Sequence, residues 1–263
     1  MAFPLADDNS DRKTFPVVTI VLIALNVLVF LLLQRMGNND EFTNAFSTVP
    51  AEIITGKDLV TEDAEHRVRT PQGQVVVYQQ TGLKRTPIPV YLTLLTSMFM
   101  HGSVMHLLGN MWFMWIFGDN IEDDLGRLEY TAFYLMCGLL AGLAHVFTNM
   151  QSEIPSLGAS GAISGVMGAY LVLHPHRRVT VLMFRFITQV PAYVAVGMWF
   201  AFQVLNSFGV LGGEGGIAYA AHIGGFIAGA AFAGVFYALR TKPPADSRLE
   251  RDQRDRFGLG RGW

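Results

Sequence analysis

The feature of this sequence that most limits its fold is a succession of long apolar runs. The first run, residues 16–33, contains no charged residue, and five more follow it along the chain. A helix needs roughly 20 apolar residues to cross the hydrocarbon core of a bilayer. Only 15% of the residues are charged, compared with about 25% in a typical soluble domain. We therefore predict an all-α membrane protein built as a bundle of six transmembrane helices. The later runs lie at about residues 103–118, 128–148, 159–173, 186–206 and 218–239.

The ends of the chain differ from its apolar middle. A cleaved signal peptide would also contain an apolar run, but no Ala-x-Ala site follows the first run at residues 34–36. We therefore predict that the first helix is retained. Residues 1–14 are predicted to form a cytoplasmic tail, and residues 15–240 the membrane domain. Residues 241–263 are charged and contain Pro and Gly, a composition that predicts a disordered cytoplasmic tail.

An insert of different composition separates the first two runs. Residues 36–90 hold most of the charge in the middle of the chain and no run long enough to cross a membrane. Residues 49–59 could form a short interfacial helix. Residues 66–78 alternate partly between apolar and polar positions and turn at residues 71–73, which indicates a small hairpin. We expect this extramembrane insert to lie on the outer side.

Positive charge indicates which side the termini face. Six crossings put both termini on one side, and Lys and Arg concentrate in loops that stay in the cytoplasm. The short loops at residues 149–158 and 207–217 hold no Lys or Arg, so we place them outside and both termini in the cytoplasm. The acidic N-terminal segment and the compact core suggest a bacterial cytoplasmic membrane. The charged residues behind this orientation are Arg12, Lys13, Arg127, Arg177, Arg178, Arg185, Arg240 and Lys242.

Polar residues are concentrated where the second, fourth and sixth runs begin. His106 and Asn110, four residues apart, share one face of the second helix. Ser160 opens the fourth run and His222 the sixth. Alternating crossings bring the starts of these three helices to the same outer face. Because polar groups inside a membrane are costly, they are candidates for function.

Together these residues fit nucleophilic catalysis. A serine hydroxyl needs a base to take its proton, and the neutral imidazole of His222 can accept it. Unpaired N–H groups at the helix start at Ser160 could stabilise an oxyanion, and His106 and Asn110 could add donors. Because the fifth and sixth runs contain no carboxylate, we predict a Ser-His dyad rather than a triad.

Taken singly, these residues have simpler explanations. A serine in a glycine-rich helix is usually a packing residue, and a membrane histidine is more often structural or part of a transport path. What favours catalysis is the conjunction of three segments at one depth. Glycines support it, because Gly225 and Gly229 form a ridge that could fit a groove at Gly161, Gly165 and Gly168. Close approach of the fourth and sixth helices would then bring His222 to Ser160.

The three clusters resemble the rhomboid family of intramembrane serine proteases, of bacterial type. The resemblance covers roughly residues 14–240 apart from the insert. It is carried by His101-(x4)-His106-(x3)-Asn110, by Gly158-Ala159-Ser160-Gly161 and by Ala221-His222-Ile223-Gly224-Gly225-(x3)-Gly229, together with Glu122 and Gly126.

The resemblance implies a role for each matching residue. Ser160 takes the place of the nucleophile and His222 that of the base, while His106 and Asn110 take the oxyanion places. Glu122 looks structural, and the supporting positions are Gly158, Gly161, His101 and Gly225. One departure is Ser164, because some bacterial members have there a tyrosine that stacks on the histidine. The family also implies no metal or cofactor, and hydrolysis of a peptide bond in or beside a transmembrane segment of single-pass or polytopic substrates in the lipid bilayer.

Two other functions are compatible with parts of the sequence. A catalytically inactive rhomboid-like protein that binds membrane clients would share the fold, although such relatives often lack the serine or the histidine. A transporter could use the membrane histidines, although charged residues are nearly absent from the runs. Nucleic acid is not an expected partner at a net charge of −2. Cys137, the only cysteine, is expected to be an apolar filler.

Overall fold

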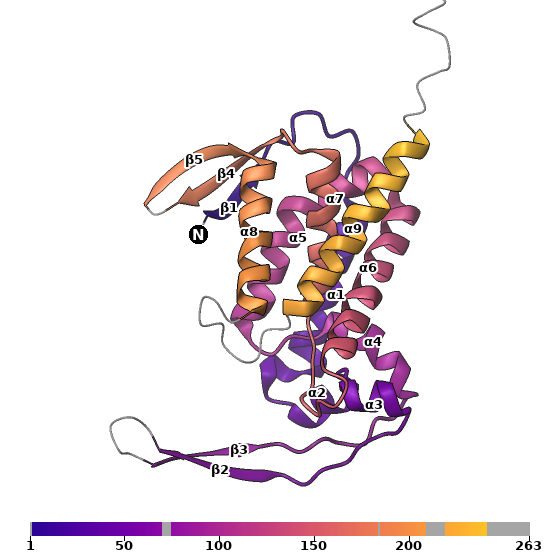
Figure 1. The fold of residues 1–263 in the computed structure, drawn as a ribbon, viewed down its shortest axis with the longest axis vertical. Coiled ribbons are helices and arrows are strands. Elements are labelled where there is room, and N and C mark those ends of the chain that lie inside the picture. The colour runs from indigo at the N-terminus through magenta and orange to yellow at the C-terminus, as the bar shows by residue number, and fades with distance from the viewer. Residues whose placement is uncertain (1, 70–74, 184, 209–218, 241–263) are drawn as a thin grey trace, which may run out of the picture.

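The computed structural model describes residues 2–69, 75–183, 185–208 and 219–240. Among these residues, six long helices pack side by side (Figure 1). Four of the predicted runs agree with helices within one residue at each end. The second run begins with α5, but this helix continues seven residues beyond residue 118. The fifth run differs as described below. The helices are α1 (Val17–Leu28, continued by the π-helical turn η1, Val29–Leu33), α5 (Val104–Leu125), α6 (Arg127–Thr148), α7 (Ser160–Leu173), α8 (Ala192–Ser207) and α9 (Tyr219–Arg240).

Two helices of the described part of the chain are long and apolar enough to cross a membrane by themselves. They are Arg127–Thr148 and Tyr219–Leu239. Val17–Leu33 and Ser160–Leu173 are apolar but shorter. Helix α5 is as long as α6, but its last two turns contain four acidic residues, Asp119, Glu122, Asp123 and Asp124. Six crossings therefore stay a prediction.

Helix α7 forms the centre of the bundle. Every residue from Gly161 to Tyr170 is buried, and α5, α6, α8 and α9 all pack against this helix. Small residues make this possible, because a Cβ atom at Gly225 would overlap the carbonyl oxygen of Gly161, and one at Gly229 that of Gly165. The predicted close approach of these two glycine-rich helices is confirmed.

The shortness of α7 sets the depth of its first residue. With 14 residues against 22 in α5, it is about 12 Å shorter at 1.5 Å per residue. The two helices end at the same level, because His174, which follows α7, contacts Asp124 near the end of α5 at 2.6 Å. Ser160 therefore begins its helix well below the rim of the bundle.

The insert covers the end of the bundle where α5, α7 and α9 begin (Figure 1). It contains α2 (Asp40–Phe46) and α3 (Pro50–Thr55), and α3 corresponds to the short helix predicted at residues 49–59. The predicted hairpin is also present, as β2 (Ala64–Arg69) paired antiparallel with β3 (Val75–Gln80). Its expected turn at residues 71–73 lies outside the described residues. The remaining short elements are η2 (Arg35–Gly37), η3 (Val90–Leu92), α4 (Thr93–Thr96) and η4 (Ser97–Phe99).

The opposite end of the bundle contains a β-sheet that the sequence analysis did not predict. There β1 (Ala2–Asp7), β4 (Arg178–Met183) and β5 (Phe186–Pro191) form an antiparallel sheet in the order β1-β4-β5. Strand β4 forms because Val179 and Val181 alternate with more exposed residues and are fully buried. The fifth run therefore starts as a strand and becomes helical only at Ala192.

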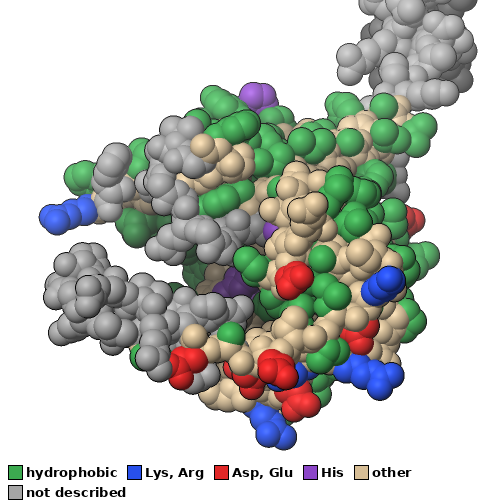
Figure 2. All heavy atoms as spheres, turned by 60° about the horizontal axis from the view of Figure 1, so that its bottom comes forward, with side chains coloured by type: hydrophobic (Ala, Val, Ile, Leu, Met, Phe, Trp, Pro, Cys, Tyr) green, Lys and Arg blue, Asp and Glu red, His purple; other side chains and the backbone are tan. Residues whose placement is uncertain are grey.

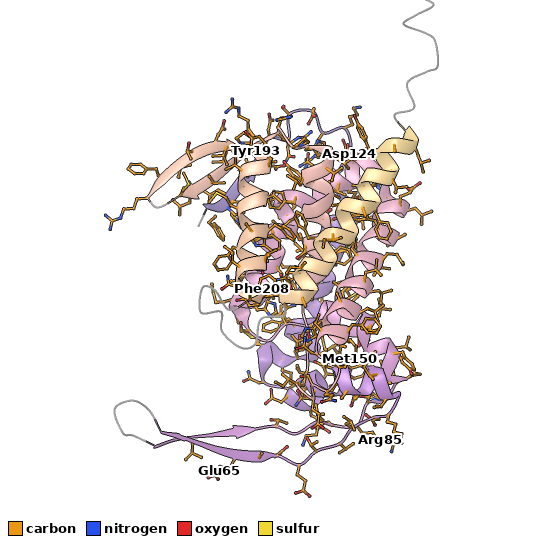
Figure 3. The ribbon with its side chains drawn as sticks, viewed as in Figure 1. Glu65, Arg85, Asp124, Met150, Tyr193 and Phe208 are labelled. Atoms are coloured by element: carbon orange, nitrogen blue, oxygen red, sulfur yellow. The ribbon has the colours of Figure 1, made fainter. Side chains whose placement is uncertain are left out.

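The first and the last described residues lie at the same end of the bundle. The first described residues lie in β1 beside β4, and α9 finishes at the same end (Figure 1). Asp124 and Tyr193 lie at this end, which we call the terminal end, whereas Met150 and Phe208 lie towards the other (Figure 3). Residues 2–7, within the segment expected to be a tail, are thus part of the sheet. The expected disordered tail at residues 241–263 lies outside the described residues.

Candidate active site

Ser160 and His222 meet at the end of the bundle that faces the insert. Ser160 is the first residue of α7, and His222 lies in the first turn of α9. The Oγ of Ser160 lies 2.8 Å from the Nε2 of His222, within hydrogen-bond distance. Ser160 and His222 are 62 positions apart in the sequence, and the glycine contact of α7 with α9 aligns the two helix starts.

Gly158 shapes the approach to the serine. Its φ of +135° lies in a region that favours glycine. A Cβ atom there would also lie only 3.0 Å from the His106 ring. Its N–H donates to the carbonyl of Ser97 at 2.9 Å, so the loop is held against the segment before α5. A larger residue would push the His106 ring away from Ser160.

The ring of His106 lies beside this loop and can supply a hydrogen-bond donor. The backbone N–H of Gly102 points to Nδ1 of His106 at 3.4 Å. With Nδ1 as the acceptor, the proton of the neutral ring lies on Nε2, the nitrogen nearest to Gly158. Asn110 is one turn further along α5 and is buried, and its Nδ2 has no hydrogen-bond partner among the described residues. A buried amide without a partner is unusual and calls for an explanation.

The sequence analysis missed the residues that contact the far side of His222. The Nδ1 of His222 lies 2.8 Å from the Oε1 of Gln203 on α8. One turn earlier on α8, the ring of Trp199 lies 6.1 Å from the imidazole, centre to centre. The serine at the place of the family's tyrosine does not replace these contacts, because Ser164 Oγ donates to the carbonyl of Ser160 at 2.6 Å. The fifth run contains no carboxylate, but its amide Gln203 was a usable signal.

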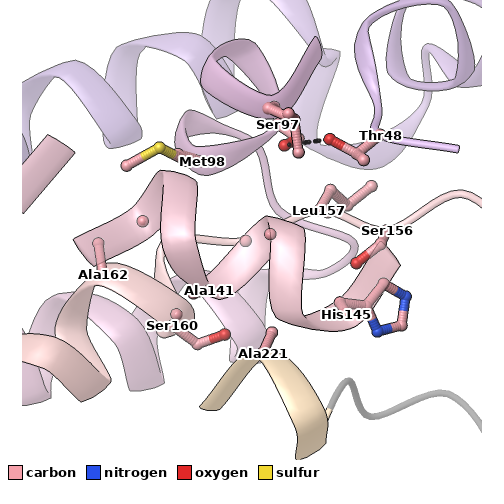
Figure 4. A pocket seen from close by; sticks show the side chains of 15 residues that line it. Thr48, Ser97, Met98, Ala141, His145, Ser156, Leu157, Ser160, Ala162 and Ala221 are labelled. Carbon is pink, nitrogen blue, oxygen red and sulfur yellow. Dashed lines mark hydrogen bonds between the residues drawn. The ribbon is translucent and has the colours of Figure 1, made fainter. Parts of the chain in front are cut away.

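A cavity of about 1090 Å³ opens onto the pair. It is lined by His106, Ser160 and His222 together with His145, Tyr219 and Ser207. Viewed from the insert's end, histidine side chains are visible in a hollow of the surface (Figure 2). A smaller pocket of about 40 Å³ lies behind Ser160, towards Ser97 and Thr48, whose hydroxyls are hydrogen-bonded to each other (Figure 4). Water and an extended peptide therefore have room beside the serine.

The comparisons with known proteins show the family of this chain. A family model described as the Rhomboid domain matches residues 89–239, more than half of the chain. The chain belongs to the rhomboid family. The matched region includes every residue of the Ser160 and His222 cluster and excludes α1 and most of the insert.

Curated relatives of this rhomboid protein resemble it over about half of its length. Rhomboid protein 1, mitochondrial, of Saccharomyces cerevisiae is 29% identical over 154 residues, which are 56% of this chain and 42% of the relative. Presenilin-associated rhomboid-like protein A, mitochondrial, of Danio rerio is 31% identical over 150 residues, 56% of this chain and 38% of the relative. The human presenilin-associated rhomboid-like protein, mitochondrial, is 30% identical over 138 residues, 52% of this chain and 35% of the relative. The chain thus matches well under half the length of each.

The relatives correct one prediction. All three names carry the word mitochondrial, which contradicts the bacterial cytoplasmic membrane inferred from the N-terminal charge and the compact core. That prediction is wrong. Acidic residues near the N-terminus do not identify a membrane, because they form part of a polar network at the terminal end. Asp7 accepts a hydrogen bond from Tyr170, and Asp11 accepts one from Arg177.

His101 lies next to the rhomboid site without entering the cavity. Its side chain is fully buried, and its ring lies edge-on to that of His106 with 5.1 Å between the ring centres. Its backbone forms a reciprocal pair with Gln34, which accepts from the His101 N–H at 2.9 Å and donates to its carbonyl at 3.0 Å. His101 therefore packs beside His106 and joins η1 to the start of α5.

Glu122 lies far from the site, near the terminal end. It belongs to α5 itself rather than to the link that follows, sixteen residues or about 24 Å beyond His106. Its carboxylate accepts from the N–H groups of Val18 and Thr19 at 2.9 and 2.8 Å, and from the Thr19 hydroxyl. These N–H groups belong to the first turn of α1 and lack intrahelical partners. Glu122 thus caps α1, in keeping with a structural role.

Proposed function

We propose that this chain is an intramembrane serine endopeptidase in which Ser160 is the nucleophile and His222 the general base. The observation that carries the proposal is the 2.8 Å contact between Ser160 Oγ and His222 Nε2 at the wall of a large cavity. Buried serines usually bond to nearby backbone, as Ser164 does. Ser160 instead directs its hydroxyl to an imidazole, which is the arrangement that activates a serine.

The proposed reaction uses Ser160, His222, His106 and Asn110. Ser160 Oγ attacks the carbonyl carbon of the scissile bond while its proton passes to His222 Nε2. The negative charge on the carbonyl oxygen is stabilised by the Ser160 N–H, His106 Nε2–H and Asn110 Nδ2. His222 then protonates the leaving amine, and the C–N bond breaks. Water from the cavity hydrolyses the acyl-enzyme with His222 again acting as base.

The membrane placement and the domain boundaries belong to the same proposal. We propose that α1 and α5–α9 all cross the membrane, that residues 15–240 form the membrane domain, and that residues 1–14 and 241–263 lie outside it. The insert at residues 36–90 and the cavity share one side, opposite to both termini. Because the relatives are mitochondrial by name, the membrane that we propose is a mitochondrial one.

The proposed substrates are membrane proteins with a segment that unwinds easily. A transmembrane helix hides its carbonyl groups in i→i−4 hydrogen bonds, so the chain must extend before Ser160 can attack it. Gly, Ala or Pro near the cleavage site should therefore favour cleavage, and a run of leucines should slow it. Equal cleavage of flexible and leucine-stiffened substrates would contradict this requirement.

The test is cleavage of a single-span model substrate by the purified protein in liposomes. Ser160→Ala should abolish cleavage because it removes the nucleophile. Ser164→Ala is the matched control, because it removes a hydroxyl one turn further along α7 that bonds only to its own helix in the described structure. Ser164→Ala should keep most of the activity. Undiminished cleavage by Ser160→Ala would refute the proposal.

The alternative is a catalytically inactive rhomboid-like protein that binds membrane clients. It is kept because two of the relatives are named rhomboid-like. A fluorophosphonate probe, which reacts with activated serines, separates the two functions without any knowledge of the substrate. Labelling that disappears in Ser160→Ala supports the enzyme. Absence of labelling in a folded wild-type protein supports the inactive alternative.

A further inference from the structure

We propose that Gln203 is a positioning residue that fixes the tautomer and the orientation of His222, so that the unit around Ser160 is Ser-His-Gln rather than an unsupported dyad. This inference rests on the proposed protease function. It extends the sequence-based prediction, which concluded from the missing carboxylate that the unit is a Ser-His dyad rather than a triad.

The hydrogen bond determines where the imidazole proton lies. A side-chain carbonyl oxygen only accepts hydrogen bonds, so Gln203 Oε1, 2.8 Å from His222 Nδ1, requires the proton on Nδ1. A neutral imidazole carries one proton, and its Nε2 is therefore free to accept. That nitrogen lies 2.8 Å from Ser160 Oγ, close enough for it to accept the serine proton. The opposite tautomer would place a proton between Nε2 and the serine and prevent transfer.

An amide suits this place better than a carboxylate would. Gln203 is 6% exposed, and a buried ionised carboxylate is costly away from water. The amide oxygen makes the same directional bond to Nδ1–H without a net charge. The bond also persists when His222 carries both protons during the reaction, because Nδ1–H donates in both states.

The neighbouring residues of α8 show that this contact is specific to Gln203. Asn206, a second buried amide on the same helix, donates to the carbonyl of Phe202 at 2.9 Å and so stays within its own helix. Gln203 instead reaches across to α9. Trp199, one turn earlier, packs its ring near the same imidazole. Both contacts that hold His222 from behind therefore come from α8.

The experiment compares three substitutions in the full-length protein. Gln203→Met keeps length and burial but removes the acceptor, Gln203→Glu keeps an oxygen acceptor, and Asn206→Leu is the matched control for loss of a buried amide on α8. For each variant, kcat and KM are measured with the single-span substrate, and the rate of fluorophosphonate labelling is measured separately. The small probe reports the reactivity of Ser160 without requiring a transmembrane segment to enter.

Gln203→Met should lower kcat and the labelling rate by the same factor, with KM unchanged. We expect about tenfold to a hundredfold, the range seen when the partner that orients a metal-bound histidine is removed. Gln203→Glu should restore most of both rates, and Asn206→Leu should leave both near wild type. If Gln203→Met does not fold, Gln203→Asn replaces it, because its amide is one methylene too short to reach Nδ1.

A spectroscopic measurement tests the tautomer directly. In protein with ¹⁵N-labelled histidine, His222 should show a protonated Nδ1 in the wild type and in Ser160→Ala, and a mixture of tautomers in Gln203→Met. His222→Gln identifies the signal. If Gln203→Met reacts with the fluorophosphonate at the wild-type rate and keeps the wild-type tautomer, the proposal for Gln203 alone is overturned. Full cleavage by Ser160→Ala would overturn the protease function, and the tautomer would still report on the contact with Gln203.

Discussion

The two ends of α5 and α7 differ in how completely their polar side chains are hydrogen-bonded. At the end that faces the insert, Asn110 Nδ2 has no partner among the described residues and Ser160 opens onto a cavity. At the terminal end, Tyr170 donates to Asp7 at 2.8 Å and Asn120 donates to the same carboxylate at 2.6 Å. Ion pairs join this network to the N-terminal segment: Arg12 with Asp119 and Arg177 with Asp11, each at 2.6 Å.

The polar residues at the site end therefore serve the proposed reaction, and those at the terminal end of the same helices stabilise the fold. A polar group that is fully paired in the resting protein has little left to offer a substrate, and its loss leaves its partners unsatisfied. A buried donor without a partner is poorly satisfied until a new acceptor arrives, such as the oxyanion of a reaction intermediate. Substitutions at the site end should therefore change rates, and those at the terminal end should change stability.

The largest effect that would test this contrast is expected for Asn110→Leu. Leucine has a similar volume and removes a buried Nδ2 that makes no hydrogen bond in the described structure, so thermal stability should not fall. Loss of one oxyanion donor should lower kcat about 10²- to 10³-fold. The measurements are thermal unfolding in detergent and cleavage of the single-span substrate. A loss of stability with unchanged kcat would reverse the contrast.

Glu122→Ala, on the same helix, should show the opposite result. It leaves the buried N–H groups at the start of α1 without an acceptor, at a cost of about 2–4 kcal/mol of unfolding free energy. The folded fraction should label with fluorophosphonate at the wild-type rate. Glu122→Gln, which keeps one acceptor oxygen, should lose less stability. A labelling rate that falls in proportion to the lost stability would show that the two ends are coupled.

The smallest effect is a dependence on pH at the terminal end. Burial raises the pKa of the Asp7 carboxyl from its usual 3.8 to about 6. Because the folded-state pKa lies above the unfolded one, the contribution of Asp7 to stability is complete below about pH 4 and is lost as the pH rises through 6. As the pH rises from 4 to 7, the melting temperature of Asp7→Asn should therefore gain several degrees relative to that of the wild type. If the melting temperatures of the two proteins change with pH in parallel across that range, the prediction is contradicted.

The predictable part of the fold came from strong and regular signals. Apolar runs as long as those of α6 and α9 indicate helices whatever surrounds them, and the spacing of Gly225 and Gly229 showed where α9 could approach α7. The sheet was missed because β5 is short and joins the apolar run of α8 without a break. Periodicity alone does not distinguish such a strand from the first turns of a helix.

The sequence by itself determined the family motifs. It also predicted the long helices and the proximity of Ser160 to His222, because alternating helices bring their starts to one level. Only the tertiary structure decided what surrounds that pair. Gln203 and Trp199 reach His222 through the packing of α8 against α9, and Glu122 caps α1 from a helix about a hundred residues later. Such contacts depend on the rotation of each helix about its axis and on which helices become neighbours, and packing sets both.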